Sequence, residues 1–443
     1  MSEKTTSGAE AEFPVSRGYS YYVFTLLFLL YVFDYIDRMV VSSLFPFLIK
    51  DWGITTVQCS WLASIVTISM TIFVFPVSLL VDRWSRKKTI GLMAVLWSIA
   101  AGACALTKNF KQLLSLRSVI GIGEAAYTPG GHAMIAAYFP EERRATMNGY
   151  FTAAIPLGSA LGVILGGQIA ETIGWRYAFG LTAIPGLFVA ILFFWVKDYK
   201  TAQIVKGKTE HFIPEDPATH EKMSFWEIVK EFAKTPSVIF TYLGYVGSTF
   251  VTTSLITFLP LYFHRIEGLD MFKAGTKTSV IFLLAIIGAP FGGFIADKWR
   301  KRRLNARMAF PAISSILTAI FLMIAFNYTE GQTQYIFLIL FGFTAPMFAS
   351  AGSAVTQDVV QPGLRAISYS LAQFFMMMLG YTLGPLFVGY MCSRFGNDFD
   401  LLPGFGLLPL FTLFGGVMFF IGSYYYVRDL KKVARVKLVE EKK

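Results

Sequence analysis

The sequence predicts an all-α membrane protein with twelve transmembrane helices in two six-helix halves. Of its 443 residues, 55% are hydrophobic and only 15% are charged, whereas charged residues make up about a quarter of an ordinary soluble protein. Apolar segments of about 20 residues, the length that crosses a bilayer, recur along the chain. Two loop sequences also recur at equivalent places in the two halves. Together these observations place the chain in a lipid bilayer.

Twelve segments are long and apolar enough to cross roughly 30 Å of hydrocarbon. In chain order they are residues 20–45, 57–81, 89–107, 110–138, 146–172, 176–196, 237–263, 273–297, 305–326, 333–358, 365–393 and 404–427. We expect a polar N-terminal tail at 1–19, without the pattern of a removable signal peptide, and six-helix bundles at 20–196 and 236–427. A basic tail at 428–443 follows.

The long hydrophilic stretch at 197–235 separates the two predicted bundles. Within it, Ser224-Phe-Trp-Glu227 has the spacing of a capping box, and the apolar residues that follow indicate a stripe on one helix face. We expect a short helix there. It either lies on the cytoplasmic membrane interface or packs on the protein as an ordinary linker helix.

The distribution of Lys and Arg predicts the orientation of the chain. With both termini inside, the inner segments hold 29 of the 39 basic residues and the outer loops hold 8, while Arg38 and Arg117 lie within spans. This asymmetry favours cytoplasmic termini, in a plasma or inner membrane. The net charge of +11 does not indicate nucleic-acid binding, because the basic residues fall in short clusters between apolar segments.

The two halves contain similar connections. Ser78-LLVDRWSRKK, between the second and third spans, parallels Gly293-FIADKWRKRR between the eighth and ninth, and Pro140-EERRA parallels Pro362-GLRA after the fourth span of each half. Two repeated six-helix halves with a site between them near the membrane centre are an architecture of secondary transporters.

Five charged residues interrupt two otherwise apolar spans. Asp34, Asp37 and Arg38 are spaced i, i+3 and i+4 in the first span, so on a helix they lie near one face. Arg117 and Glu124 lie two helical turns apart in the fourth span. Because charges at membrane depth are costly, they mark pathways for ions or substrate. The alternative is a permanently paired polar cluster that fixes helix packing.

Small residues indicate close helix contacts in both halves. Gly158, Gly162 and Gly166 share one face of the fifth span, and Gly380 and Gly384 repeat this spacing in the eleventh. The segment 374–378 and the hydroxyl residues near 249–254 either line a cavity or pack against lipid and core, and packing is the simpler interpretation. His132 has no Cys or carboxylate at ligand spacing, so we expect a hydrogen-bonded packing residue and no metal site.

The loop and fourth-span motifs resemble those of the major facilitator superfamily. Asp82-Arg83-x-x-Arg86-Lys87 resembles its signature between helices two and three, with Ser78 in place of the usual leading glycine, and Arg117-SVI-Gly121-I-Gly123 resembles its fourth-helix signature. The resemblance covers essentially the whole chain. It implies the major facilitator fold and transport by alternating access.

A subfamily resemblance comes from the first, fourth and fifth spans. Asp34-Tyr-Ile-Asp37-Arg38 resembles the Asn-Tyr-Met-Asp-Arg stretch of Spinster-like transporters, as do Gly121-IGEAAYT and Ala154-IPLGSALG. Asp34 departs from the asparagine of that family, which leaves two carboxylates where one is expected. Anion-transporting subfamilies also place Tyr-x-Asp-Arg in the first helix.

The resemblance implies roles for Asp37, Arg38 and Glu124, and the roles of Asp34 and Arg117 are our own hypothesis. Asp37 is expected to be the main proton-coupling carboxylate, with Glu124 its partner and Asp34 a third such group. Arg38 is expected to bind an anionic substrate group, and Arg117 to hold a carboxylate in place or contribute to substrate binding. These residues would line one side of a central cavity.

The repeated loops suggest an inner gate. Asp82 and Asp297 lie at helix ends beside basic residues, where salt bridges between helices could hold such a gate closed. The basic residues of these loops, Arg83, Arg86 and Lys298 among them, are also explained by positive-inside topology alone.

We therefore expect a proton-coupled secondary transporter of an organic anion or a lysolipid-like amphiphile. The alternatives are an importer of a small carboxylate or sugar acid, and a sensor on the same fold that binds without transporting. The sequence has no Gly-x-x-x-x-Gly-Lys-Ser/Thr loop and no nucleophile constellation, so neither an enzyme nor a cofactor is expected. The expected partners are an anionic small molecule or lipid, protons and the bilayer, and the expected state is a monomer.

Overall fold

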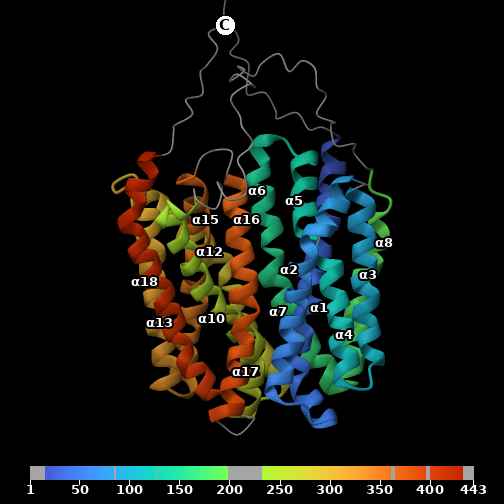
Figure 1. The fold of residues 1–443 in the computed structure, drawn as a ribbon. Helices are drawn as coiled ribbons and strands as arrows, with labels where there is room; N and C mark the ends of the chain where they lie inside the picture. Colours follow the sequence, from blue (N-terminus) through green and yellow to red (C-terminus); the bar gives the residue numbers. More distant parts are fainter. Residues whose placement is uncertain are drawn as a thin grey trace, which may run out of the picture. The chain divides into compact units, whose positions relative to one another are not determined.

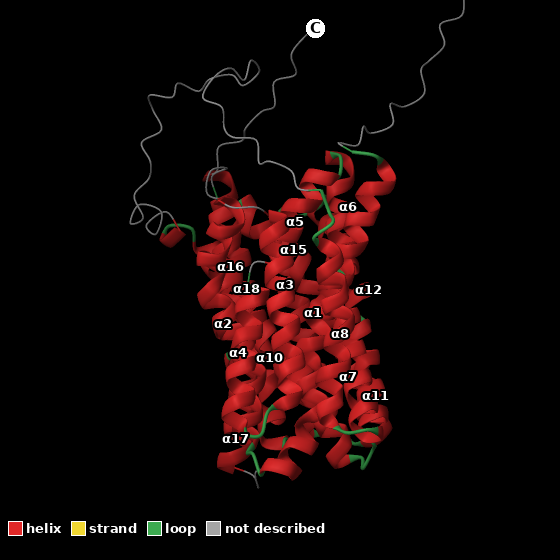
Figure 2. Cartoon of the chain, turned by 90° about the vertical axis from the view of Figure 1, so that its right-hand side faces the viewer, coloured by secondary structure: helices red, strands yellow, loops and turns green. Residues whose placement is uncertain are grey.

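The computed structural model describes residues 15–83, 86–125, 127–197, 232–360, 365–395 and 400–432. Every regular element within these ranges is a helix, and short loops join the helices (Figure 2). The predicted all-α fold class is confirmed. The linker helix predicted within 197–235 falls almost entirely outside the described residues, as does most of the two tails.

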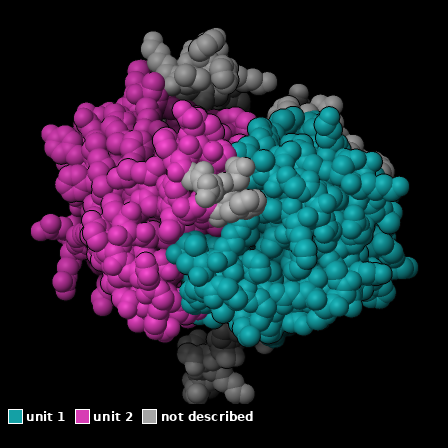
Figure 3. All heavy atoms as spheres, turned by 90° about the horizontal axis from the view of Figure 1, so that it is seen from below, with its two compact units in different colours: residues 1–201, 256–283 teal, residues 202–255, 284–443 magenta. Residues whose placement is uncertain are grey.

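Two compact units make up the chain: unit 1 contains residues 1–201 and 256–283, and unit 2 contains residues 202–255 and 284–443 (Figure 3). The first eight α-helices belong to unit 1 and are labelled in Figure 1. They are α1 (Arg17–Trp52), α2 (Thr56–Arg83), α3 (Arg86–Ala103) with the short 3-10 helix η1 (Cys104–Leu106), α4 (Phe110–Glu124), α5 (Tyr127–Tyr138), α6 (Glu141–Thr152), α7 (Ala154–Thr172) and α8 (Trp175–Phe193).

The remaining helices begin after the linker. They are α10 (Pro236–Ile266), α11 (Met271–Leu283), α12 (Ala285–Arg300), α13 (Ala306–Asn327), α14 (Gly331–Thr344), η2 (Ala345–Met347), α15 (Phe348–Asp358), α16 (Arg365–Phe375), the π-helical segment η4 (Met376–Tyr381), α17 (Leu383–Phe395) and α18 (Leu402–Lys432). The last part of α10 and all of α11 belong to unit 1, and the rest belong to unit 2.

All twelve predicted spans coincide with helices in the described residues, several of them broken into two or three elements. Ten helical stretches are long and apolar enough to cross a membrane by length and composition. The two spans outside this set, 20–45 and 110–138, correspond to α1 and to α4 with α5. They are also the spans that contain the five charged residues.

Glycines on α7 let the backbone of α1 approach closely. A Cβ atom built on Gly158 would lie 2.5 Å from the carbonyl oxygen of Val32, and one on Gly162 would lie 2.7 Å from that of Ile36. Gly166 faces Ser43 in the same way. The predicted small-residue face is confirmed. It fixes the stretch of α1 from Val32 to Ser43, which carries its three charged residues, against α7.

The same device positions α4. A Cβ atom on Gly121 would collide with the backbone of Val66 in α2, and one on Gly123 would lie 2.8 Å from the Cβ of Trp97 in α3. These two glycines lie between Arg117 and Glu124 in sequence. Close packing of α4 on α2 and α3 therefore holds both charged residues in the interior of unit 1.

Small residues also bring α11 against α7 within unit 1. A Cβ atom on Gly167 would lie 2.7 Å from the carbonyl oxygen of Met271, and the hydroxyl of Ser279 donates to the carbonyl of Ala160 at 3.0 Å. In unit 2, Gly380 and Gly384 pack against Thr249 and Phe250 of α10. The small-residue contact predicted for the eleventh span is thus confirmed as well.

Candidate functional site

The five charged residues predicted from the sequence lie together in unit 1. Four of them are almost completely buried, with 1% exposure for Asp34, Arg117 and Glu124 and 3% for Asp37. The side chain of Arg38 is 13% exposed. Arg38 is therefore the most exposed member of the cluster.

Arg38 pairs with two carboxylates at once. Its Nη2 lies 3.1 Å from Asp34 Oδ2, one helical turn earlier on α1, and its Nε lies 2.9 Å from Glu124 Oε2 on α4. The guanidinium also stacks over the ring of Tyr35 at 4.8 Å, and Nη2 approaches the sulfur of Met70 at 3.4 Å. Arg38 thus links α1 to α4 electrostatically.

Asp37 has no such partner. Both of its carboxylate oxygens are buried without a hydrogen-bond donor among the described residues. The charges that act on it include those of Asp34, Arg117 and Glu124. A buried carboxylate without a donor is costly in its ionised form, so Asp37 has the surroundings expected of a group that binds and releases a proton.

Arg117 bonds to the backbone rather than to a carboxylate. Its Nε donates to the carbonyl of Leu62 in α2 at 2.7 Å, and its Nη2 donates to the carbonyl of Arg38 in α1 at 3.4 Å. Nη1 is buried without a partner in the described part of the chain. Arg117 therefore ties α4 to α1 and α2 and acts on Asp37 across a longer distance.

Aromatic side chains that no sequence pattern singled out lie beside this cluster, with Tyr31 near Arg38 and Tyr127 near Asp34. Tyr31 stacks on Phe151 with a 4.5 Å separation of ring centroids and lies 5.5 Å from the ring of Tyr127. The hydroxyl of Tyr127 donates to the carbonyl of Leu27, and Trp97 packs edge-on against Tyr127. Nothing in their spacing distinguishes them from the many other aromatic residues of this chain.

His132, the histidine of the predicted fourth span, lies in α5. Its Nδ1 lies 2.9 Å from the side-chain oxygen of Asn148 in α6, and its ring packs edge-on against Phe151. The predicted hydrogen-bonded packing role is confirmed.

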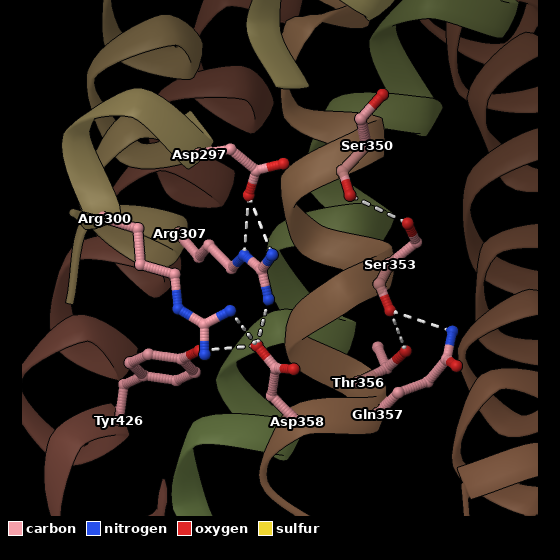
Figure 4. Close-up of polar contacts among 9 residues, drawn as sticks. All are labelled: Asp297, Arg300, Arg307, Ser350, Ser353, Thr356, Gln357, Asp358 and Tyr426. Atoms are coloured by element: carbon pink, nitrogen blue, oxygen red, sulfur yellow. Dashed lines mark hydrogen bonds and ion pairs between the residues drawn. The ribbon is translucent and has the colours of Figure 1, made fainter. Parts of the chain in front are cut away.

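A second polar cluster lies at helix ends in unit 2, where Arg307 bridges two aspartates (Figure 4). Its guanidinium lies 2.8 Å from Asp297 at the end of α12 and 2.7 Å from Asp358 at the end of α15. Asp358 also accepts a hydrogen bond from the hydroxyl of Tyr426 at 2.8 Å and lies 3.6 Å from Arg300. This cluster joins α12, α13, α15 and α18.

The predicted gate residues fall only partly within this cluster. Asp297 belongs to it, whereas Lys298 lies over the ring of Phe294 at 5.9 Å. The side chains of Asp82, Arg83 and Arg86 lie outside the described set. Arg307 and Asp358 were not among the predicted gate residues, because their link to Asp297 depends on the packing of helices far apart in sequence.

Charged groups buried within membrane-spanning helices, held by helices that pack through glycine, define a multi-pass membrane transporter. The chain belongs to the Major Facilitator Superfamily, whose family model matches residues 27–377. Members of this family are transporters rather than enzymes.

Two groups of relatives are similar to this chain. It is 28% identical to a hexuronate transporter of Bacillus subtilis, over 85% of this chain and 88% of the relative. It is 26% identical to the sphingosine-1-phosphate transporter SPNS2 of Xenopus tropicalis, over 92% of this chain and 82% of the relative. The resemblance to Spinster-like transporters is confirmed, and the resemblance extends to a sugar-acid transporter.

The fold is also that of a solved Spinster homologue. A bacterial homologue of the human lysosomal transporter Spinster, in an inward-facing and unoccupied conformation, matches with a TM-score of 0.76 at 22% identity. The match covers 94% of this chain and 98% of that one. The major facilitator fold predicted from the sequence is confirmed.

Proposed function

We propose that this protein moves an organic anion across the membrane by alternating access, coupled to protons. The proposal rests on the different surroundings of two charged residues in the cluster. Asp37 is a carboxylate without a hydrogen-bond donor in the described residues, beside an arginine that is partly exposed and held by two further carboxylates. The first can bind a proton and the second can bind an anion.

Asp37 is the main proton-coupling group of this proposal, with Glu124 and Asp34 coupled to it through Arg38. Protonation of Asp37 removes an unpaired buried charge, so it lowers the cost of moving the cluster between water-exposed and closed states. Arg38 receives the anionic group of the substrate. Arg117 supports Asp37 and positions α1, α2 and α4, since its own hydrogen bonds go to their backbone.

The substrate class follows from Arg38 and from the named substrates of the relatives. A hexuronate carries a carboxylate and sphingosine-1-phosphate carries a phosphate, and both groups suit an arginine. The similarity to the hexuronate transporter favours a small sugar acid. In unit 2, the described charged residues lie in connections or near helix ends, so the helix interiors there are uncharged, which favours an amphiphile with an apolar tail.

The gate and the topology complete the proposal. Asp82, Arg83, Arg86, Asp297 and Lys298 contribute to an inner gate, and both termini are cytoplasmic in the plasma or inner membrane, as the Lys and Arg distribution favours. The bundles at 20–196 and 236–427 act as the two moving halves of a monomer. A fluorescent-protein fusion to the C-terminus tests the orientation, and light scattering of the purified protein tests the monomer.

Uptake into liposomes tests the function. Purified protein is reconstituted, a pH gradient is imposed, and uptake of labelled D-glucuronate and of sphingosine-1-phosphate is followed. We expect gradient-driven uptake of one of them, and its loss in Asp37→Asn. Asp51→Asn is the matched control, because Asp51 is a half-exposed residue at the end of the same helix. Intact gradient-driven uptake by Asp37→Asn would show that the assignment of Asp37 is wrong, and saturable binding without uptake would favour a sensor.

A further inference from the structure

Asp34 has a place in the cluster that its family resemblance does not explain. The Spinster-like motif has asparagine at this position, whereas Asp34 here lies 3.1 Å from Nη2 of Arg38. We propose that Asp34 is a tethered counter-ion, which competes with the anionic group of the substrate for Arg38 and so sets the affinity of the site. This inference rests on the proposed function, since it assigns the regulation of that same site.

The competition follows from how the guanidinium is shared. A guanidinium presents its N–H donors along fixed edges, and a carboxylate or phosphate binds best to two parallel donors on one edge. Glu124 occupies Nε at 2.9 Å and Asp34 occupies Nη2. An anion that binds through Nη1 and Nη2 displaces Asp34 and leaves Glu124 in place. Asp34 is therefore the competitor and Glu124 the anchor.

Charge balance gives the same assignment. Asp34 and Glu124, when both are ionised, surround one guanidinium with two negative charges, and Asp37 on α1 adds a third nearby. An incoming anion is repelled by this excess. The charged and titratable groups that interact electrostatically with Asp34 are Arg38 and Asp37 on α1, Glu124 on α4 and the hydroxyl of Tyr127 on α5. Neutralising Asp34 removes one negative charge and frees Nη2, so proton uptake there and anion binding favour each other.

Inorganic sulfate is the probe that tests this without knowledge of the substrate. The melting temperature of the purified full chain is measured against sulfate concentration at constant ionic strength for wild type, Asp34→Asn, Asp34→Glu and Asp37→Asn. We expect Asp34→Asn to be stabilised at sulfate concentrations about tenfold lower than wild type, a difference that corresponds to about 1.4 kcal/mol. Asp34→Glu keeps the counter-ion and should respond as wild type does.

The control variants separate competition from a general charge effect. Asp37→Asn removes the same charge three residues away without freeing a donor of Arg38, so it should gain clearly less sulfate sensitivity than Asp34→Asn. The double variant Asp34→Asn with Arg38→Gln should lose the gain. An Asp34→Asn response equal to wild type, or an equal gain in Asp37→Asn, overturns the proposal. Asp34→Ser also removes the charge and replaces Asp34→Asn if that variant does not fold.

A second set of titrations with D-glucuronate and sphingosine-1-phosphate distinguishes the two proposals. If neither organic anion stabilises any variant while the sulfate difference holds, the proposed substrate class fails and the role of Asp34 stands. If either anion binds wild type and binds Asp34→Asn no more tightly, the role of Asp34 fails and the proposed function stands.

Discussion

Unit 1 and unit 2 place their charged side chains in opposite ways. In unit 1, α1 and α4 carry three carboxylates and two guanidiniums in their interior, all nearly buried. In unit 2, the described charged residues lie in connections or near helix ends, as in the cluster around Arg307 (Figure 4). Buried charges within helices suit chemistry, while charges at helix ends join helices. The two units therefore differ: the cluster of unit 1 suits the binding of protons and anions, and the cluster of unit 2 joins helix ends.

Removing the shared cation of unit 1 is expected to have the largest effect. Arg38→Gln leaves Asp34 and Glu124 buried without their partner, and breaking a buried pair in this way costs about 3–5 kcal/mol. Transport should fall at least about a hundredfold, the equivalent of about 2.8 kcal/mol. Arg176→Gln is the control, because Arg176 is 45% exposed and lies 3.9 Å from its partner Asp51. Uptake assays measure the loss of transport in both variants. Equal losses would contradict the idea that the buried cation matters more than the exposed one.

Overpacking at the glycine contacts tests whether the two units are alike in their scaffolds. Leucine at Gly158 in unit 1 or at Gly384 in unit 2 would collide with the backbone of the adjacent helix, and overpacking costs about 1–3 kcal/mol or more. Both variants should lower the melting temperature by similar amounts. Gly149→Leu is the control, since a Cβ atom there meets nothing within 4 Å. A lowered melting temperature in only one of the two variants would show that the glycine contacts of the two units differ in importance.

Changes in the unit 2 cluster should affect stability more than transport. Asp358→Asn removes the charge that faces Arg307 at 2.7 Å and Arg300 at 3.6 Å, and we expect a loss of about 1–2 kcal/mol. Asp297→Asn should cost less than about 1 kcal/mol, because Asp297 is 64% exposed. Denaturant unfolding measures the loss of stability in both variants. A small loss of transport in Asp297→Asn at unchanged stability would fit its proposed part in the inner gate, whereas a loss as large as that expected for Arg38→Gln would contradict this order.

The smallest effect is expected from a charge at a helix end in unit 1. Asp270 accepts hydrogen bonds from the backbone and side chain of Lys273 at 2.7 and 2.9 Å, and these lower the pKa of Asp270. A carboxyl group with a lowered pKa contributes stability that is present above its unfolded pKa of about 3.9 and is lost as the pH falls through its folded value.

Melting temperatures at about pH 6 and about pH 3 test this pH dependence. Wild type should lose slightly more stability over that range than Asp270→Asn does. High salt should reduce the difference, because the side chain of Asp270 is 38% exposed and its interactions are screened. A loss of stability as large as the about 3–5 kcal/mol expected for Arg38→Gln would contradict the expectation that charges at helix ends matter less than buried ones.

Local patterns predicted the helices and their glycine contacts well. The apolar length located each span, and the spacing of Gly158, Gly162 and Gly166 predicted the face that meets α1, because small residues at every fourth position share one side of a helix. The spacing of Asp34, Asp37 and Arg38 likewise predicted that they lie near one face.

The pairing of the charges could not be predicted in this way. Spacing gives the face of one helix but not the rotation of its neighbours, so it did not predict that Arg38 pairs with Glu124 on α4, or that Asp37 has no hydrogen-bond donor among the described residues. The backbone hydrogen bonds of Arg117 depend on how closely α4 approaches α2. The bridge from Arg307 to Asp358 depends similarly on the packing of α13 against α15.

The contact between α1 and α7 has a consequence for motion. Where Gly158 and Gly162 meet the carbonyl groups of Val32 and Ile36, the Cβ atoms of Tyr35 and Met39 lie against the same glycines. Surfaces packed this closely move as one body rather than deform. Any displacement of α7 therefore carries Asp34, Asp37 and Arg38 with it, as one rigid group.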